Sequence, residues 1–170
     1  MDLERYKIDQ LSEFGFRFYS NGPKGAFKMH VRFSYLGRNI FNLGFGVVES
    51  ASGRLNDLIE VRNGDSKKIL ATVAAIALEF MEDHPGAVIY ATGSTPSRTR
   101  LYQMGINRIL PTLEQYQIVG STSEDRLADY TESARYGRKP KWQEVELGKS
   151  YKAFLLFDPA ITNLEILFNI

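Results

Sequence analysis

The sequence predicts an α+β domain, in which an antiparallel β-meander is followed by a helix, a strand and a second helix, and then by C-terminal strands. Two patterns support this fold class. Apolar residues alternate with period two early in the chain, whereas residues 65–84 repeat them at intervals of three and four. The short apolar run 87–91 lies between two helical segments and is typical of a strand covered on both faces.

Alternating apolar residues define the predicted meander. Residues 14–19 form its first strand, and the turn-rich stretch 20–25 leads into a second strand over residues 27–35. A tight hairpin then returns the chain over residues 41–47, and a short fourth strand is expected over residues 58–61. Because short turns join these strands in sequence, neighbouring strands should pair antiparallel.

The second strand and its return arm differ in the chemistry of one face. Lys28, His30 and Arg32 share the face opposite the apolar residues of the second strand. Gly44 and Gly46 lie on the corresponding face of the return arm, where they mark a bulge or a surface that another backbone or a ligand approaches closely. In this setting His30 is either a general base or, as we favour, an exposed strand residue.

The first helix has clear boundaries. Asp65 or Ser66 can cap its N-terminus, and the sequence His84-Pro85-Gly86 ends it. Its many alanines favour a helix and allow it to pack closely on a sheet.

A second helix follows the buried strand. Thr95 is the expected N-cap, Pro96 takes the first helical position, and Gly105 is a natural C-cap. Strand 87–91 is therefore expected inside the sheet, with a helix before it and a helix after it.

Beyond residue 105 the expected elements are shorter. A helical piece over residues 106–113 is broken by Pro111, and strands are expected over residues 116–120 and 151–157. Residues 121–141 are polar and should form a long excursion from the domain.

The C-terminal segment alternates apolar and polar residues from Leu164 to Ile170 and predicts a terminal strand. Such a strand should pair with a sheet edge or a partner chain, because an exposed apolar edge invites aggregation. We expect residues 1–170 to form a single domain.

Composition restricts the possible functions. The 170 residues include 21 basic and 20 acidic side chains, so no strong overall field recruits nucleic acid or a membrane. The chain has no cysteine, which excludes disulfides and thiolate chemistry, and its two histidines are too few to predict a metal site. The N-terminus lacks the apolar core of a signal peptide, and we expect a cytoplasmic protein.

The turn before the second helix is the first candidate anion site. Gly93, Ser94 and Thr95 lead from the buried strand into the helix N-terminus, and Arg98 and Arg100 follow in its first turns. Backbone N–H groups and the positive end of the helix dipole would attract an anion there. The two arginines diverge by about 200° on an ideal helix, so only one can easily face a ligand. Alternatively, the turn residues merely cap the helix and the arginines pair with surface carboxylates.

The turn before the first helix is the second candidate. Gly64 and Ser66 enter this helix, and Lys67 and Lys68 lie in its first turn, where cations oppose the helix dipole unless an anion binds. The simpler interpretation is that Asp65 or Ser66 caps the helix and the lysines extend into solvent.

These two helix starts carry a resemblance to the GCN5-related N-acetyltransferase (GNAT) core. Gly64-Asp65-Ser66, followed by Ile69, is similar in spacing to that family's pyrophosphate loop, and residues 101–106 look like its Leu-Tyr segment. The resemblance implies a GNAT-like mixed sheet that binds acetyl-CoA or another acyl-CoA. Gly64, Ser66 and Lys67 would bind the cofactor, and Tyr102 would be the catalytic tyrosine that protonates the thiolate.

The chain also looks like a bacterial domain of unknown function. The similarity includes the turn 22–25, the loop 63–66 and the segment from Gly93 to Tyr102. This resemblance covers more of the chain, but it implies no activity.

Three functions therefore remain open. The leading hypothesis is binding of a phosphate-bearing small molecule, with acyl transfer as its enzymatic form. An interaction module, acting through residues 161–170 in a homodimer or with another protein, is the alternative. The basic and aromatic stretch 135–142, together with Arg98, Arg100 and Arg108, makes nucleic-acid binding a third and less favoured possibility.

Overall fold

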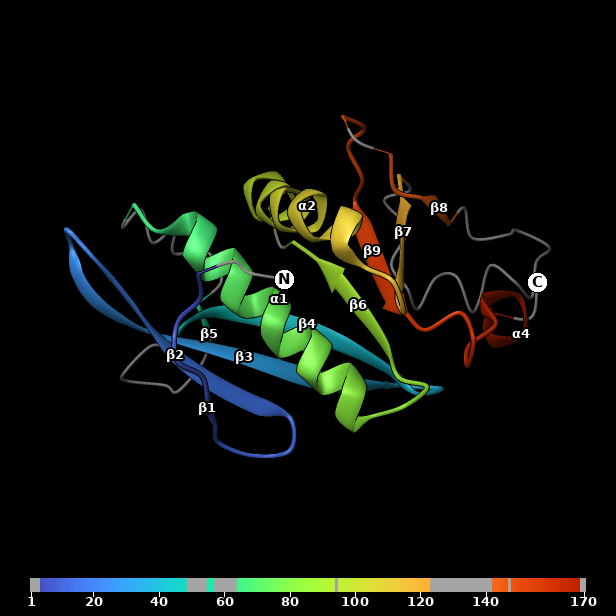
Figure 1. The fold of residues 1–170 in the computed structure, drawn as a ribbon, viewed down its shortest axis with the longest axis horizontal. Helices are drawn as coiled ribbons and strands as arrows, with labels where there is room; N and C mark the ends of the chain where they lie inside the picture. The colour runs from blue at the N-terminus through green and yellow to red at the C-terminus, as the bar shows by residue number, and fades with distance from the viewer. Residues whose placement is uncertain are drawn as a thin grey trace.

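The computed structural model describes residues 4–48, 55–56, 64–93, 95–122, 142–146 and 148–168. Within these residues, one mixed sheet carries two long helices on one face and a short helix on the other (Figure 1). In chain order the elements are β1 (Asp9–Gln10), β2 (Gly15–Gly22), β3 (Gly25–Gly37), β4 (Ile40–Val48), β5 (Leu55–Asn56), α1 (Ser66–Asp83), β6 (Val88–Thr92), α2 (Pro96–Ile109), the 3₁₀ helix η1 (Leu110–Thr112), β7 (Gln117–Ser121), β8 (Gln143–Glu144), β9 (Ala153–Phe157) and α4 (Leu164–Phe168).

The sheet follows the order β1-β2-β3-β4-β6-β9-β7-β8, and β5 pairs with β4 off this path. Strands β2, β3 and β4 form the predicted antiparallel meander. Strand β4 then pairs parallel with β6, and β9 lies between β6 and β7, antiparallel to both. The parallel pairing requires the crossover that α1 provides, so this helix connects β4 to β6 across one face of the sheet (Figure 1).

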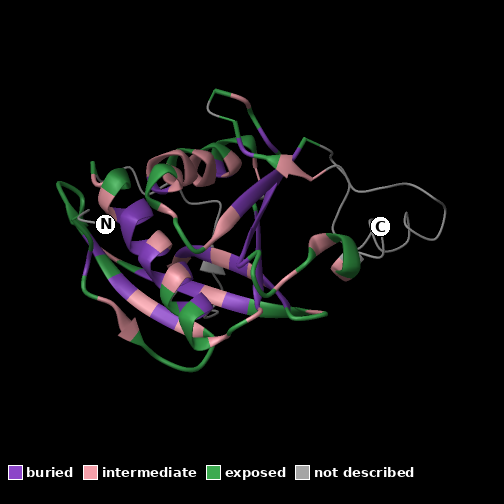
Figure 2. Cartoon of the chain, turned by 45° about the vertical axis from the view of Figure 1, so that its right-hand side comes forward, coloured by how far each residue is buried: buried purple, intermediate pink, exposed green. Residues whose placement is uncertain are grey.

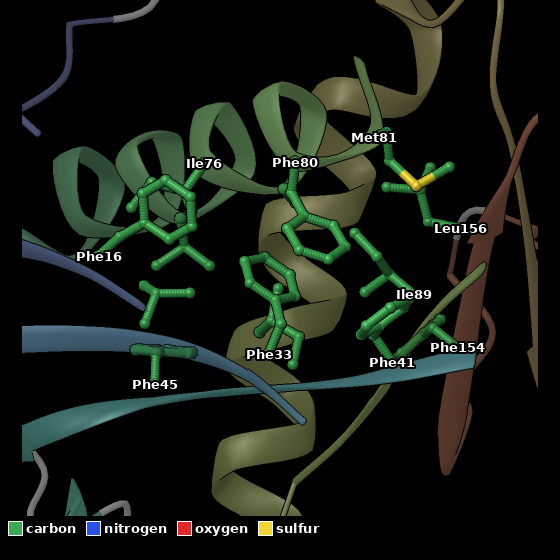
Figure 3. Close-up of a cluster of buried hydrophobic side chains, with 14 of the residues drawn as sticks. Phe16, Phe33, Phe41, Phe45, Ile76, Phe80, Met81, Ile89, Phe154 and Leu156 are labelled. Atoms are coloured by element: carbon green, nitrogen blue, oxygen red, sulfur yellow. The ribbon is translucent and has the colours of Figure 1, made fainter. Parts of the chain in front are cut away.

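The main core lies between the sheet and helices α1 and α2. Helix α1 turns its apolar residues, Phe80 among them, onto the inward-facing side chains of the meander (Figure 3). The ring of Phe80 stacks on that of Phe33, with centroids 3.9 Å apart, and meets Phe41 edge-on at 5.1 Å. Each fully buried side chain of this size stabilises the fold by about 1.5–3 kcal/mol.

The opposite face of the sheet has two different regions. At the β6–β9–β7 end, a smaller apolar cluster that includes Val88 and Leu155 is covered by Leu164 and Leu167 of α4. Along the meander, buried residues alternate with more exposed ones, because one side of each strand faces the core and the other does not (Figure 2). We call the side away from α1 and α2 the outer face.

Gly105 is not the C-cap that the sequence predicted, because α2 continues to Ile109. A Cβ atom at residue 105 would lie 3.5 Å from Leu70, an ordinary packing distance, so this position faces α1 and has room for a methyl group. The apolar residues that follow it pack on the core, and this packing favours continuation of the helix over termination at a glycine. Pro111 lies in η1, immediately after α2.

The C-terminal prediction was also wrong where the structure describes it. Residues 164–168 form the short helix α4 and not a strand. The side chain of Asn163 accepts hydrogen bonds from the N–H groups of Glu165 and Ile166, and this N-cap starts a helix. Leu164 and Leu167, three residues apart, then reach the same apolar cluster.

Two further predictions fall mainly on undescribed residues. The fourth strand expected over residues 58–61 lies outside the described residues, and strand β5 is found at Leu55–Asn56 instead. Of the excursion expected over residues 121–141, only the first two residues are described, and Ser121 belongs to β7.

Candidate functional site

The candidate site lies where β4 and β6 separate. The parallel pairing covers only Ile40–Asn42 of β4, and the end of β4 pairs with β5 at Val47 and Val48. Between these two pairings, side chains of α2 donate to β4 carbonyls on the edge that β6 has left. The Tyr102 hydroxyl donates to the Leu43 carbonyl at 3.4 Å, and Arg98 Nη2 donates to the Phe45 carbonyl at 2.8 Å. We call this region the β4–β6 split. The split lies on the carboxyl side of the paired residues, and open α/β sheets bind ligands outside the carboxyl ends of their strands.

An apolar pocket of about 80 Å³ lies beside the split. Helix α1 lines it with Leu70 and Ala74, α2 with Tyr102 and Ile106, and the sheet with residues that include Leu43. Tyr102 is the one polar side chain among the described residues that line it. The pocket is about half the size of an engineered 150 Å³ apolar cavity that binds benzene, so a short acyl group matches its volume and chemistry.

The N-terminus of α2 is largely closed by the chain itself. Thr95 is the N-cap, as predicted, and its hydroxyl accepts a hydrogen bond from the Arg98 N–H at 3.3 Å. A Cβ atom at Gly93 would lie 2.2 Å from the Thr99 nitrogen, so the backbone at residue 93 runs directly against the first turn. Ser94 lies outside the described residues.

The two candidate arginines point to different environments, as helical geometry predicts. The Arg98 side chain turns into the core, where it is 6% exposed and its guanidinium lies 4.7 Å from the centre of the Phe45 ring. Arg100 is exposed. Anion binding at this corner remains a prediction, and Arg98 already has a structural role there.

The N-terminus of α1 differs because the side chain of its N-cap residue makes no capping hydrogen bond. Asp65 occupies the N-cap position, but its carboxylate Oδ2 accepts hydrogen bonds from the hydroxyls of Tyr6 and Ser20, each at 2.5 Å. Asp65 therefore takes the N-cap position, as predicted, but its side chain does not cap the helix, since its carboxylate binds long-range partners instead. Gly64 has φ +74°, which favours glycine, and Lys67 is exposed in the first turn.

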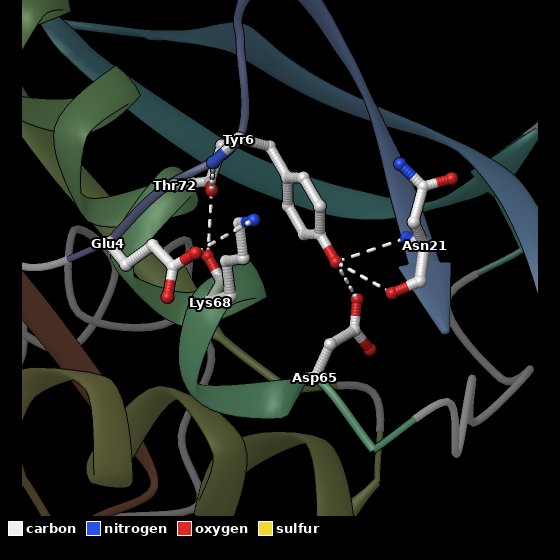
Figure 4. A network of polar contacts seen from close by, with 6 residues as sticks. All are labelled: Glu4, Tyr6, Asn21, Asp65, Lys68 and Thr72. Atoms are coloured by element: carbon white, nitrogen blue, oxygen red, sulfur yellow. Dashed lines mark hydrogen bonds and ion pairs between the residues drawn. The ribbon is translucent and has the colours of Figure 1, made fainter. Parts of the chain in front are cut away.

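A polar network fastens the N-terminal segment to this corner (Figure 4). The Tyr6 hydroxyl accepts from the Asn21 N–H at 3.0 Å, and the Tyr6 N–H donates to the Thr72 hydroxyl at 2.9 Å. Lys68 Nζ lies 4.3 Å from the centre of the Tyr6 ring and 3.3 Å from a Glu4 carboxylate oxygen. Burial and the hydrogen bond to Asp65 raise the pKa of Tyr6. These contacts set the position of the α1 N-terminus.

No pattern in the sequence predicts this network. Asp65 follows Ser20 by 45 residues and Tyr6 by 59, and no local motif connects it to them. A carboxylate at a helix start is usually a cap, so the sequence pattern favoured the wrong partner.

The two histidines lie apart. His30 belongs to β3, whereas His84 follows α1 and stacks on Phe80 with ring centroids 4.1 Å apart. The described residues contain no group of three or more His, Cys, Asp or Glu side chains arranged to hold a metal ion. In the same part of the chain, no helix combines the length and the apolar character needed to cross a membrane.

Residues 2–158 match a family of unknown function, DUF6934. The chain belongs to this family. Neither the curated proteins nor the solved structures include a match to it. The family assigns no reaction, and the resemblance to acetyltransferases stays a prediction. Function must therefore be argued from the geometry of the β4–β6 split and the α1 N-terminus.

Proposed function

We propose that this DUF6934 domain binds a phosphate-bearing small molecule at the N-terminus of α1, with the apolar part of the ligand in the pocket beside the β4–β6 split. An acyl-CoA has both parts. The observation that carries the proposal is the start of α1, where the N-cap side chain makes no capping hydrogen bond and which leads in about one turn to the pocket wall at Leu70.

The phosphate end of the ligand would meet backbone and charge together. Gly64 leaves the approach to the helix start without a side chain, and the dipole of α1 favours an anion there. Lys67 by itself opposes this dipole, and it would pair with a bound phosphate. Ser66, also exposed, adds a hydroxyl at the same turn.

The acyl end would lie in the pocket. Leu70 follows Ser66 by about 6 Å of helical rise, so one extended ligand spans both places. If the domain transfers the acyl group, Tyr102 is the residue on the pocket wall that can protonate a leaving thiolate. Its hydroxyl lies 3.4 Å from the Leu43 carbonyl oxygen, which is long for a hydrogen bond, so a ligand can replace this contact.

Calorimetry with CoA and acetyl-CoA tests the proposal. We expect both to bind, and we expect Lys67→Gln to weaken both about two- to fivefold, as loss of one exposed charge pair should. Arg100→Gln is the matched control at the other helix and should leave binding unchanged. Ala74→Leu, which fills the pocket, should remove any preference for acetyl-CoA over CoA. Absence of heat with either ligand at high micromolar concentration would refute the proposal.

A protein-interaction role is the second candidate, favoured by exposed apolar side chains near the C-terminus. Ile161 and Ile166 are 57% and 75% exposed. Removal of residues 161–170 should convert a dimer or hetero-complex into a monomer in light-scattering measurements. An unchanged mass for the truncated chain would exclude this segment as the interface.

A further inference from the structure

A cluster of basic side chains lies on the outer face of the meander, on the side of the sheet opposite the pocket. Arg17 of β2 and His30 of β3 are direct cross-strand partners, and Lys28 and Arg32 lie two residues to either side of His30. All four side chains share one face because side chains alternate along a strand. We call these residues the outer basic cluster.

The neighbouring strands complete the surroundings of the cluster. Across β2, Asp9 of β1 faces Arg17 and lies 3.4 Å from it, measured from Oδ2 to Nη2. Across β3, Gly46 faces His30 and brings no side chain. Arg17 therefore has one acidic partner on its far side, while toward His30 it meets another basic group. When His30 is protonated the two charges repel each other, because like charges placed opposite each other in a sheet are destabilising.

Within the described part of the chain, two nitrogen atoms of the cluster, Nε of Arg17 and Nε2 of His30, are buried and have no hydrogen-bond partner. The arginine Nε–H is a donor at every physiological pH. A buried polar group without a partner is rare in native proteins and often indicates a missing ion or water. Here the two unpartnered atoms belong to residues that face each other across the strands.

The basic neighbours of His30 disfavour its protonated form. Burial lowers the pKa of His30, and the neighbouring charges of Arg32, Lys28 and Arg17 lower it further. An anion beside His30 would oppose these charges and favour the protonated ring, which can donate from both nitrogen atoms.

We propose that Arg17 and His30 hold a small phosphate-type oxyanion, inorganic phosphate or the phosphate of a monoester, between β2 and β3. Facing side chains in an antiparallel pair are about 5 Å apart at Cβ, so one tetrahedral anion can reach both. Lys28 is exposed and supplies charge at the rim. A small anion suits this position better than a long polymer, because the two unpartnered nitrogen atoms are buried.

An NMR titration of the two histidine rings tests this site. The pKa values of His30 and His84 are measured in chloride and in inorganic phosphate at equal ionic strength. We expect phosphate to raise the pKa of His30 in a saturable manner, while His84, at the end of α1, serves as the internal control. Arg17→Gln should raise the phosphate concentration needed for half of this effect about tenfold or more, whereas Arg100→Gln should not.

Three results would overturn the proposal. The first is a His30 pKa that does not respond to phosphate. The second is a response that Arg17→Gln leaves intact or that His84 shares equally. The third is a response to single-stranded oligonucleotides but not to phosphate. The Lys67→Gln variant separates this site from the proposed ligand site, since it should weaken CoA binding and leave the phosphate response of His30 unchanged.

Discussion

Arg98 offers the sharpest test of how the β4–β6 split is built. Its side chain crosses from α2 to β4, donates to the Phe45 carbonyl at 2.8 Å, and lies over the Phe45 ring. We predict that Arg98→Ala destabilises the domain strongly, because it removes both contacts and leaves a buried carbonyl without this donor.

The expected magnitude follows from these two contacts. A hydrogen bond from a charged donor contributes about 1.5–3 kcal/mol, and a cation–π contact about 0.5–2 kcal/mol. The free energy of unfolding should therefore fall by about 2–5 kcal/mol, and the melting temperature by roughly 2–4 °C for each kcal/mol. Arg98→Met keeps much of the apolar stem and should lose mainly the contacts of the charged group.

Urea denaturation followed by circular dichroism measures the effect. Arg100→Ala is the matched control, because this arginine is exposed on the same helix and its loss should change stability by no more than about 0.5 kcal/mol. If Arg98→Ala unfolds at the same urea concentration as the parent, the side chain is not a structural bridge. Arg98 would then again be the leading anion ligand at the α2 N-terminus.

Three further predictions concern the surrounding structure. Tyr6→Phe should cost about 1–3 kcal/mol in urea denaturation, because Asp65 loses a hydrogen-bond donor; an unchanged midpoint would show that the network is dispensable. Gly93→Ala should lower the melting temperature, because its Cβ would lie 2.2 Å from the Thr99 backbone nitrogen. Gly105→Ala should raise the melting temperature, because alanine favours a helix over glycine by up to about 1 kcal/mol and residue 105 has room for a methyl group. Equal changes in melting temperature for the two variants would contradict this difference in packing. The folded domain lowers the pKa of His30 and so favours its neutral ring; the resulting stability is fully present above pH 6.5, the ordinary pKa of histidine, and is lost as the pH falls below 6.5. His30→Asn should therefore make the free energy of unfolding less dependent on pH in the acidic range. Coincident pH profiles of the variant and the parent would exclude this contribution.

Local patterns predicted most of the fold. Alternating apolar residues located the meander, and the change to helical spacing located α1. Thr95 and Pro96 marked the start of α2, because a cap acts on residues next to it in sequence. Predictions failed where a distant contact was stronger than a local preference. Helix α2 continues past Gly105, for example, because the helix face that includes residue 105 packs on α1.

The candidate sites depended far more on tertiary structure. The sequence alone determined which side chains share a strand face, including Lys28, His30 and Arg32, because alternation is a property of the strand itself. Only the tertiary structure decided that Arg98 reaches Phe45, that Asp65 binds Tyr6, and that Arg17 faces His30. Two of these pairs join residues more than 50 positions apart, and the third depends on strand register. Sheet order, register and helix packing bring them together, and no local pattern records those choices.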